Sequence, residues 1–203
     1  MTQASELRLT DRKRAAILGA AVDEFCDRGF YAASMNRIAE LAEVSKRTLY
    51  KHFESKETLF EAIVEELLVR VESIPYRDFD PDQDLEEQLA AVVRAEVQIM
   101  SSEPVQALAR AGISRVIAEP EVARSIDHDR FLLRSVRWLK QAKAAGHFSE
   151  MKDVEFAAQQ FCGLVQQFAF WPTILKGEGP LTPHRRKKIV GETVQMFLSR
   201  YGA

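Results

Sequence analysis

Residues 44–57 of the chain, VSKRTLYKHFESKE, decide the fold because they combine a short cationic helix, an aromatic pair and the start of a second helix. Ser45 is a good N-cap for a helix from about residue 46 to 52. Leu49 and Phe53 are spaced to lie together on the buried side of that helix. The outward residues are then cationic or hydroxyl-bearing, and such side chains donate hydrogen bonds to phosphate. The stretch therefore indicates contact with a DNA duplex.

A second short helix is expected just before this stretch, over residues 34–42, SMNRIAELA. Ser34 is suited to cap it, and only Glu43 and Val44 separate it from the Ser45 cap. Two short helices joined by such a turn form a helix-turn-helix, whose second helix enters the major groove while the first crosses the backbone. The residues expected to be buried in this helix are Ile38, Leu41 and Ala42.

A third and longer helix is expected from Asp11 to Arg28, with Thr10 as its cap and Gly29 as its stop. Together, residues 10–59 resemble the DNA-binding domain of the TetR family of bacterial transcriptional regulators. The resemblance is carried by three motifs: A-x-x-x-F-x-x-x-G-F-Y-x-x-S at Ala21 to Ser34, I-A-x-x-A-x-V-S at Ile38 to Ser45, and T-L-Y-x-H-F-x-S-K-E-x-L at Thr48 to Leu59.

One position departs from the family pattern. Many members carry glycine in the turn where this chain has Glu43. A left-handed conformation there would cost a non-glycine residue roughly 1 kcal/mol. We therefore expect a strained turn within an otherwise ordinary helix-turn-helix.

The resemblance also implies a role for each outward residue. The start of the second helix of the motif reaches base edges, and Arg47 has the bidentate geometry that reads guanine O6 and N7. The other residues are expected to hold the phosphate backbone. For each cation taken alone, the alternative is a solvated surface charge, and for His52 it is an ordinary surface histidine. The residues expected to contact DNA are Thr10, Ser34, Arg37, Ser45, Lys46, Arg47, Thr48, Tyr50, His52 and Lys56.

Composition limits how DNA is bound. The chain has 28 Lys and Arg against 30 Asp and Glu, so it is not a general coat for a polyanion. Its apolar stretches are too short to span a bilayer, and its N-terminus lacks the apolar core of a signal peptide. Cys26 and Cys162 are expected to be free buried thiols without metal-ligand spacing. We expect a bacterial cytoplasmic protein, associated with the nucleoid when bound to DNA, with no metal and no cofactor.

The rest of the sequence is helical in pattern, which predicts an all-α fold of about nine helices in total. The predicted domains are a helix-turn-helix domain at 1–55 and a larger domain at 56–203, which binds an effector and dimerises. A helix at 56–73, capped by Ser55, connects the two. The sequence further predicts a break at residues 75–81, a helix capped by Asp84 with Glu87, and one long helix from Glu121 to about Ala145.

The last two predicted helices favour dimerisation. The helix from Asp153 to Trp171 is apolar around most of its circumference, so it needs two burial partners. The final helix begins at Thr182-Pro183. These two helices from each subunit are expected to form a four-helix bundle, as in the TetR family. The expected interface residues are Gln160, Gly163, Gln167, Val194, Phe197 and Tyr201.

The resemblance implies a ligand cavity in the larger domain, whose C-terminal half is similar to the AefR-like branch of the family. Glu96 falls on the stripe with Val92 and Met100, where a charge needs a partner. For the aromatic residues, the alternative is an ordinary core. An apolar lining favours a hydrophobic or amphipathic effector. The expected pocket residues are Glu96, Met100, Trp138, Phe161 and Phe168.

These observations predict a sequence-specific DNA-binding regulator. The expected form is a homodimeric repressor that a small effector releases from a palindromic double-stranded operator. Two alternatives remain: a TetR-like dimer controlled by a protein partner, and a helical enzyme acting in the C-terminal cavity. The sequence offers no paired carboxylates with an associated base, no Ser-His-Asp grouping and no phosphate loop. No catalytic residue is therefore expected.

Overall fold

The structure is a computed structural model that describes residues 3–74 and 77–202, and within these ranges every regular element is a helix. The predicted all-α fold class is confirmed. The elements in the described ranges are α1 (Gln3–Ala32), α2 (Met35–Leu41), α3 (Lys46–His52), α4 (Lys56–Ser73), α5 (Leu85–Met100), α6 (Glu103–Ala118), α7 (Pro120–Ser125), a 3-10 turn η1 (His128–Phe131), α8 (Leu133–Ala144), α9 (Val154–Ala169), α10 (Trp171–Lys176) and α11 (Pro183–Tyr201).

The prediction of one long helix from Glu121 to about Ala145 is wrong. The chain forms α7, η1 and α8 instead, because Ile126 adopts an extended conformation with φ −83° and ψ 122°. Long-range bonds then hold η1 and α8. Arg130 pairs with Glu72 at 2.6 Å, and the Arg134 guanidinium donates to the Val71 carbonyl at 2.9 Å. The periodicity of the sequence does not reveal such partners.

The sequence predicts a break between helices at residues 75–81. Residues 75 and 76 lie outside the described residues, so the structure tests only the rest of this prediction. Residues 77–84 form no helix. The following helix, α5, is capped as predicted, with the Glu87 amide donating to Asp84 Oδ1 at 2.8 Å. Asp153 caps α9 and Thr182 caps α11 in the same way, at 2.9 and 3.2 Å.

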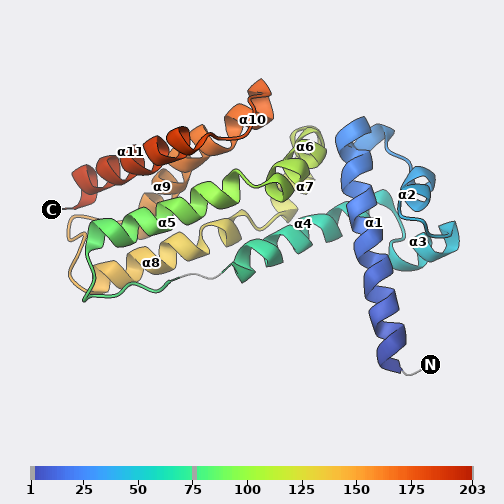
Figure 1. Ribbon diagram of the computed structural model, residues 1–203, viewed down its shortest axis with the longest axis horizontal. Coiled ribbons are helices and arrows are strands. Elements are labelled where there is room, and N and C mark those ends of the chain that lie inside the picture. The colour runs from blue at the N-terminus through green and yellow to red at the C-terminus, as the bar shows by residue number, and fades with distance from the viewer. Residues whose placement is uncertain (1–2, 75–76, 203) are drawn as a thin grey trace. The chain divides into compact units, whose positions relative to one another are not determined.

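The chain divides into two compact units. The first contains the residues up to Val69 together with Ala107–Ile126, so it includes most of α6 and all of α7. Figure 1 shows α2 and α3 beside α1. Its core contains fully buried aromatic and aliphatic side chains that α1 to α4 contribute, among them Ile17, Phe25, Ile38, Leu49, Leu59 and Phe60.

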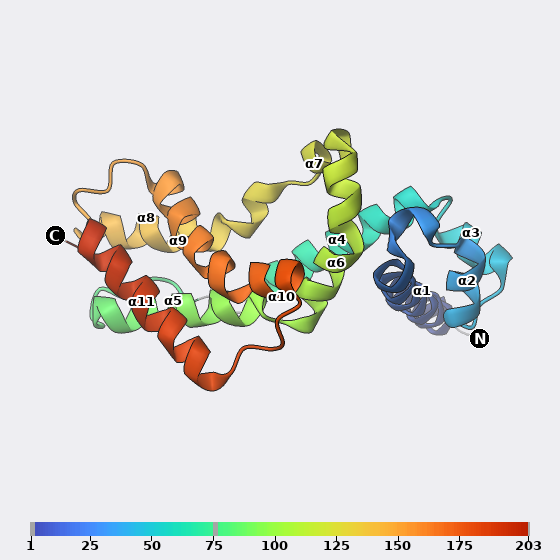
Figure 2. The same ribbon diagram turned by 90° about the horizontal axis from the view of Figure 1, so that it is seen from above.

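The second unit contains Arg70–Gln106 and the residues from Asp127 onward. Here α5, α8, α9 and α11 lie side by side as a bundle (Figures 1 and 2). Aromatic rings join these helices in the core, with the Phe197 ring 5.7 Å from both Phe148 and Phe161. This division by contacts differs from the predicted domains, 1–55 and 56–203, which remain a prediction.

Three details of the first three helices differ from expectation. Thr10 lies inside α1 and does not cap it. Gly29, with φ 73° and ψ 161°, kinks the chain, but the helix continues to Ala32. Leu41 is 43% exposed, whereas Ala39 is buried at 2%. The Val44 amide bonds to the Ala39 carbonyl at 3.0 Å, so the turn folds back onto α2.

The strained turn is confirmed. Glu43 has φ 52°, in the left-handed region that favours glycine. Its amide bonds to the Glu40 carbonyl at 3.1 Å, closing the end of α2. The helix-turn-helix thus holds a non-glycine residue in a conformation that its backbone disfavours.

No helix in the described residues is both long enough and apolar enough to cross a membrane.

Candidate nucleic-acid interface

The second helix of the motif, α3, is built by its cap. The Thr48 amide donates to Ser45 Oγ at 3.1 Å, and the hydroxyls of Ser45 and Thr48 are 2.8 Å apart. On the opposite side Leu49 is fully buried and Phe53 is 6% exposed. The orientation of α3 is therefore fixed, and its outward side chains are Lys46, Arg47, Tyr50 and Lys51, all exposed.

These outward side chains are what DNA recognition requires. Lys46 and Arg47 occupy the first turn of α3, the part of a recognition helix that reaches base edges. Tyr50 is 48% exposed and presents a hydroxyl suited to a phosphate oxygen. The Thr48 hydroxyl is already shared with the cap, and His52 is half-buried. The structure thus places the predicted contacts Lys46, Arg47 and Tyr50 together on the exposed side of α3.

The helix before it, α2, begins with a bond that the sequence did not reveal. The Ser34 side chain makes no capping bond, and instead the Ser34 amide donates to Glu24 Oε1 of α1 at 3.2 Å. Glu24 is only 4% exposed. A signal was present, because Glu24 is a charged residue beside Ala21 and Phe25 on the apolar stripe of α1. The Ser34 hydroxyl remains available on an exposed residue.

Two further predicted contacts are exposed. Thr10 lies on the exposed side of α1. Arg37 lies on α2 and pairs with Glu40 at 3.3 Å, with 54% of its side chain exposed. A surface pair of this kind contributes little and can be exchanged for a phosphate at small cost.

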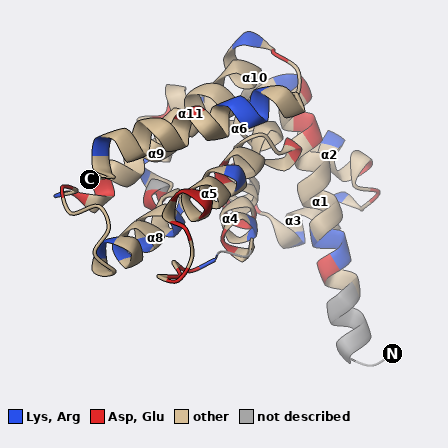
Figure 3. Cartoon of the chain, turned by 60° about the vertical axis from the view of Figure 1, so that its left-hand side comes forward, with Lys and Arg blue, Asp and Glu red and all other residues tan. Residues whose placement is uncertain are grey.

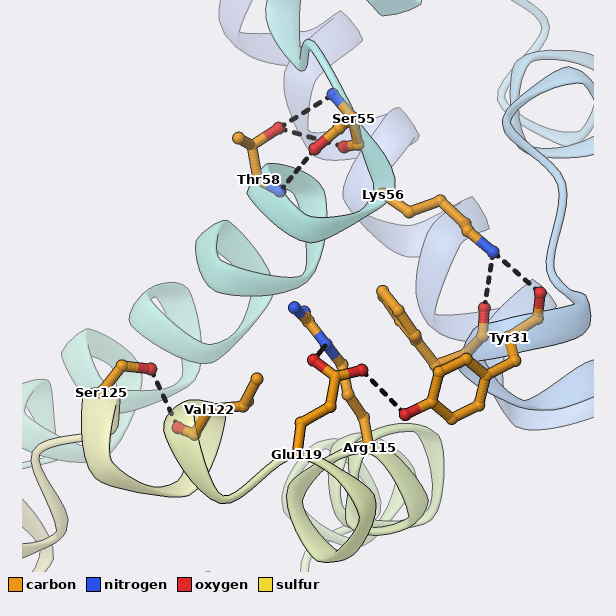
Figure 4. A network of polar contacts seen from close by, with 9 residues as sticks. Tyr31, Ser55, Lys56, Thr58, Arg115, Glu119, Val122 and Ser125 are labelled. Carbon is orange, nitrogen blue, oxygen red and sulfur yellow. Dashed lines mark hydrogen bonds and ion pairs between the residues drawn. The ribbon is translucent and has the colours of Figure 1, made fainter.

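Lys56, a predicted phosphate contact, also makes bonds within the protein. Its ammonium donates to the carbonyls of Phe30 and Tyr31, each at 2.9 Å, and lies 5.1 Å from the Phe30 ring centroid (Figure 4). Two of the three N–H groups of the ammonium are thus used inside the protein. Lys56 joins the start of α4 to the end of α1.

The start of α4 is capped as predicted. The Thr58 amide donates to Ser55 Oγ at 3.2 Å, and the Ser55 amide donates to Thr58 Oγ1 at 3.1 Å. Two amide donors are therefore satisfied reciprocally, as in a capping box. This fixes the point at which the chain leaves α3.

Charge along the chain is mixed. Figure 3 shows both Lys or Arg and Asp or Glu scattered over the helices. The first turn of α11 is the most cationic run, with Arg185, Arg186, Lys187 and Lys188 all exposed. Arg185 stacks on the Phe168 ring at 5.7 Å, both within the second unit. The cationic surface of α3 is therefore local, in keeping with the overall charge.

The predicted pocket residues of the second unit are mostly interior. Glu96, Met100, Trp138 and Phe161 are buried, with Glu96 at 3% exposure, while Phe168 is 40% exposed. The predicted interface residues divide in two. Gln160, Gly163 and Gln167 are exposed on α9, while Val194, Phe197 and Tyr201 are buried in the core of the unit.

Glu96 lies in a buried polar cluster with Arg134, Ser135 and Cys162. Its Oε1 atom has no hydrogen-bond partner among the residues that the structure describes. Burial raises the pKa of the Glu96 carboxyl to about 7, and the nearby charge of Arg134 opposes this. Cys162 Sγ lies 3.7 Å from Ser135 Oγ. Burial, together with Glu96, raises the pKa of the Cys162 thiol to about 12.

The two cysteines are free, as predicted, but Cys26 is exposed and not buried. Its thiol donates to the Ala107 carbonyl at 3.2 Å.

A surface groove of about 1200 Å³ lies along α5 in the same unit. The sequence predicted only Trp138 of its lining. The groove is lined by small and apolar residues of α5 and by acidic residues of α5 and of the preceding loop. Its lining includes Asp80, Glu87, Gln88, Ala91, Ala95 and Trp138.

The geometry of the first unit defines a class of protein. A helix-turn-helix with a capped second helix, buried on one side and cationic on the other, is the architecture of proteins that read the major groove of DNA. A separate helical bundle follows it in this chain.

Comparison with known proteins gives the family. The model "Bacterial regulatory proteins, tetR family" matches residues 17–63, and the model "AefR-like transcriptional repressor, C-terminal domain" matches residues 87–203. The chain therefore belongs to the TetR family of bacterial transcriptional regulators, which bind DNA through this motif.

Individual relatives support this membership. A TetR family transcriptional regulator from Pseudomonas syringae is 36% identical, with a TM-score of 0.81 over 95% of this chain and 98% of that one. The Flavonoid-responsive Regulator FrrA is 26% identical, with a TM-score of 0.71 over 94% of this chain and 97% of its own. The HTH-type transcriptional activator FasR of Mycolicibacterium smegmatis is 47% identical over 55 residues, which are 27% of this chain.

The matches to curated relatives are partial. The matched segment is 25% of the length of FasR and 32% of the length of a second curated transcriptional regulator.

Proposed function

We propose that this regulator is a homodimeric repressor that binds a palindromic operator in the bacterial cytoplasm and is released by a small hydrophobic or amphipathic effector. The observation that carries the proposal is the exposed cationic side of α3 in a capped helix-turn-helix. Two such helices, about 34 Å apart in a dimer, would read successive turns of the major groove.

The proposed base contacts are Lys46 and Arg47, because both are exposed in the first turn of α3. Arg47 is assigned the bidentate contact to guanine. Tyr50 and His52 are assigned to phosphates on one side of the groove. Ser45 and Thr48 contribute through the cap, which limits their freedom to reach bases. Thr10, Ser34, Arg37 and the remaining N–H of Lys56 complete the proposed backbone contacts.

Dimerisation is supported by the outer side of α9. Gln160, Gly163 and Gln167 are exposed at helical spacing, and Phe156 on the same side is 54% exposed. A Cβ added at Gly163 would meet no other atom within 4 Å. The side is thus apolar at one end and open at its centre, which suits close approach of a second α9. The buried residues Val194, Phe197 and Tyr201 would support this surface from behind.

The effector is proposed to enter the core of the second unit near Glu96, Met100, Trp138 and Phe161, with Phe168 nearer its surface. The support is the Glu96 Oε1 atom, which is buried without a hydrogen-bond partner. An effector hydroxyl or amine would satisfy it, since an unpaired buried acceptor is costly. The relative FrrA is named for its response to flavonoids, which are aromatic molecules with hydroxyl groups.

Repression is proposed over activation because the model matching residues 87–203 is that of a repressor domain. The relative FasR, in contrast, is named as an activator. A protein partner in place of a small effector is a second candidate, and the long open groove along α5 is the observation in its favour. The proposal includes no catalytic step.

The test combines DNA binding and mass measurement. The full chain is mixed with DNA carrying its own promoter, and footprinting is expected to show a protected palindrome whose occupancy falls steeply with salt. Native mass spectrometry is expected to show a dimer with a retained small ligand. Protection of a single half-site by a monomer would overturn the homodimer. A co-purifying protein without a small ligand would favour the second candidate.

A further inference from the structure

One part of the DNA-binding unit comes from far along the chain. Most of α6 and all of α7 pack within the same compact unit as the helix-turn-helix, although the family model for the DNA-binding domain ends at residue 63. The contact is close. A Cβ added at Gly112 of α6 would lie 2.8 Å from the ring of Phe60, so only glycine permits this approach.

Arg115 of α6 is the centre of the contact. It is only 4% exposed, and its guanidinium carbon lies 4.2 Å from the Phe30 ring centroid and 4.9 Å from that of Phe60. Arginine stacks well on aromatic faces because its charge is delocalised and weakly hydrated. Its Nε atom pairs with Glu119 Oε2 at 3.3 Å, which turns the carboxylate toward α1.

Glu119 then extends the network to the surface. Its Oε1 atom accepts a hydrogen bond from the Tyr31 hydroxyl at 2.7 Å (Figure 4). This bond raises the pKa of the Tyr31 hydroxyl above its usual value. The carbonyl of Tyr31 in turn accepts from Lys56 at the start of α4. Figure 4 shows Tyr31 of α1, Lys56 of α4 and Arg115 of α6 converging, with Glu119, which directly follows α6, beside Arg115 and Tyr31.

The network contacts the chain on both sides of the helix-turn-helix. Phe30 and Tyr31 follow the kink at Gly29 and lie a few residues before Ser34, the N-cap of α2. Lys56 is the first residue of α4, which follows α3 after a short connection. The network therefore holds the chain just before the helix-turn-helix and just after it.

We propose that Arg115 and Glu119 are positioning residues for operator recognition, which act through Tyr31 and Lys56 to hold the helix-turn-helix in its DNA-reading geometry. Arg115 and Glu119 contribute to operator affinity although neither side chain is proposed to touch DNA. The Tyr31 hydroxyl donates a hydrogen bond to the Glu119 carboxylate. Arg115, stacked on Phe30 and Phe60, orients that carboxylate through its own pair with Glu119.

The test uses the full chain and two variants, Tyr31→Phe and Glu119→Ala, with the double variant. Alanine is chosen at position 119 because glutamine would keep an oxygen that accepts from Tyr31. Tyr31 is 57% exposed, so Tyr31→Phe removes one hydroxyl without opening the core. Tyr31→Phe is expected to weaken specific operator binding about fivefold, the value of one hydrogen bond. Glu119→Ala also loses the pair with Arg115 and is expected to weaken operator binding at least as much. The double variant is expected to be no weaker than Glu119→Ala alone, because that variant already removes the Tyr31–Glu119 bond.

Two readouts separate positioning from other roles. Binding to non-specific DNA, and the slope of log affinity against log salt, are expected to stay unchanged, because no phosphate contact is lost. Glu119→Ala is also expected to lower the pKa of Tyr31 in an ultraviolet titration. The matched control is Glu121→Ala, since Glu121 lies on α7 in an exposed pair with Arg124 at 3.2 Å and should leave operator binding unchanged.

Three results would overturn the proposal. Unchanged operator affinity in both single variants would show that the network does not position the motif. A reduced salt slope in Tyr31→Phe would make Tyr31 a phosphate ligand in its own right. Strictly additive losses in the double variant would show that Tyr31 and Glu119 act separately.

Discussion

The amide of Ser34 donates its hydrogen bond to the carboxylate of Glu24, ten residues earlier in the chain, across 3.2 Å. The N-terminus of α2 is thus capped by a side chain of α1, while the Ser34 side chain makes no capping bond. A carboxylate suits this position because the amides at a helix start are partially positive. The bond links α1 directly to the first helix of the DNA-reading motif.

Replacing Glu24 with alanine is expected to destabilise the protein by about 1.5–3 kcal/mol, the value of a hydrogen bond to a charged group. Glu24→Gln retains an acceptor and should lose less. Urea unfolding of the variants measures the change. Asp23→Ala is the matched control, because Asp23 is the adjacent acidic residue and is exposed. Equal losses for Glu24→Ala and Asp23→Ala would refute the cap.

Replacing Glu43 with glycine is expected to stabilise the protein by up to roughly 1 kcal/mol, because glycine adopts the left-handed conformation without strain. The observed φ of 52° is the basis for this expectation. Thermal unfolding measures the gain. Glu40→Gly in α2 is the control and should destabilise by about 1 kcal/mol, since glycine lowers the stability of a helix interior. A loss in both variants would contradict the strained turn.

Replacing Arg47 with alanine is expected to weaken operator binding about ten- to a hundredfold and to relax base preference at one position of each half-site. The reason is the loss of a bidentate contact to guanine. Fluorescence anisotropy with the operator and with single-base variants of it measures both effects. Lys187→Ala, an exposed cation on α11, is the control for net charge. Equal weakening on every sequence would instead make Arg47 a phosphate contact.

Stability is expected to depend on pH through Glu96. Burial raises the pKa of this carboxyl from 4.5 to about 7, so the folded chain holds the proton more tightly than the unfolded chain. The resulting stabilisation is full below pH 4.5 and is lost as the pH rises through about 7. Its size is roughly 3 kcal/mol between these limits. The charged groups beside it are Arg134, and Cys162 once ionised.

The variant Glu96→Gln removes this titration. It should match the parent protein near pH 4.5, where the parent carboxyl is protonated, and should be more stable near pH 8. Denaturant midpoints at the two pH values measure the difference. Glu86→Gln, an exposed position in the first turn of α5, should show no such pH dependence. An advantage of Glu96→Gln that is equal at both pH values would argue for packing in place of titration.

Several features were determined by the sequence alone because both partners lie within one short window. The caps by Ser45, Ser55, Asp84, Asp153 and Thr182 each join a side chain to an amide three residues later. The left-handed conformation of Glu43 was expected from the resemblance, because many family members carry glycine at this position of the turn. Leu49 and Phe53 had to be buried once α3 was recognised, and this left its cations outward.

Only the tertiary structure decided the rest, because long-range partners leave no periodic signal. The sequence gives no partner for the charged Glu24 on the apolar stripe of α1, whereas in the structure its carboxylate accepts a hydrogen bond from the Ser34 amide. Lys56 belongs to a phosphate-contact motif by sequence but binds the carbonyls of Phe30 and Tyr31. Tyr31 and Glu119 are 88 positions apart and meet only because α6 packs against Phe60. Short-range sequence patterns determine where the helices form. The way in which distant helices join depends on hydrogen bonds between buried polar groups, because a buried polar group without a partner costs free energy.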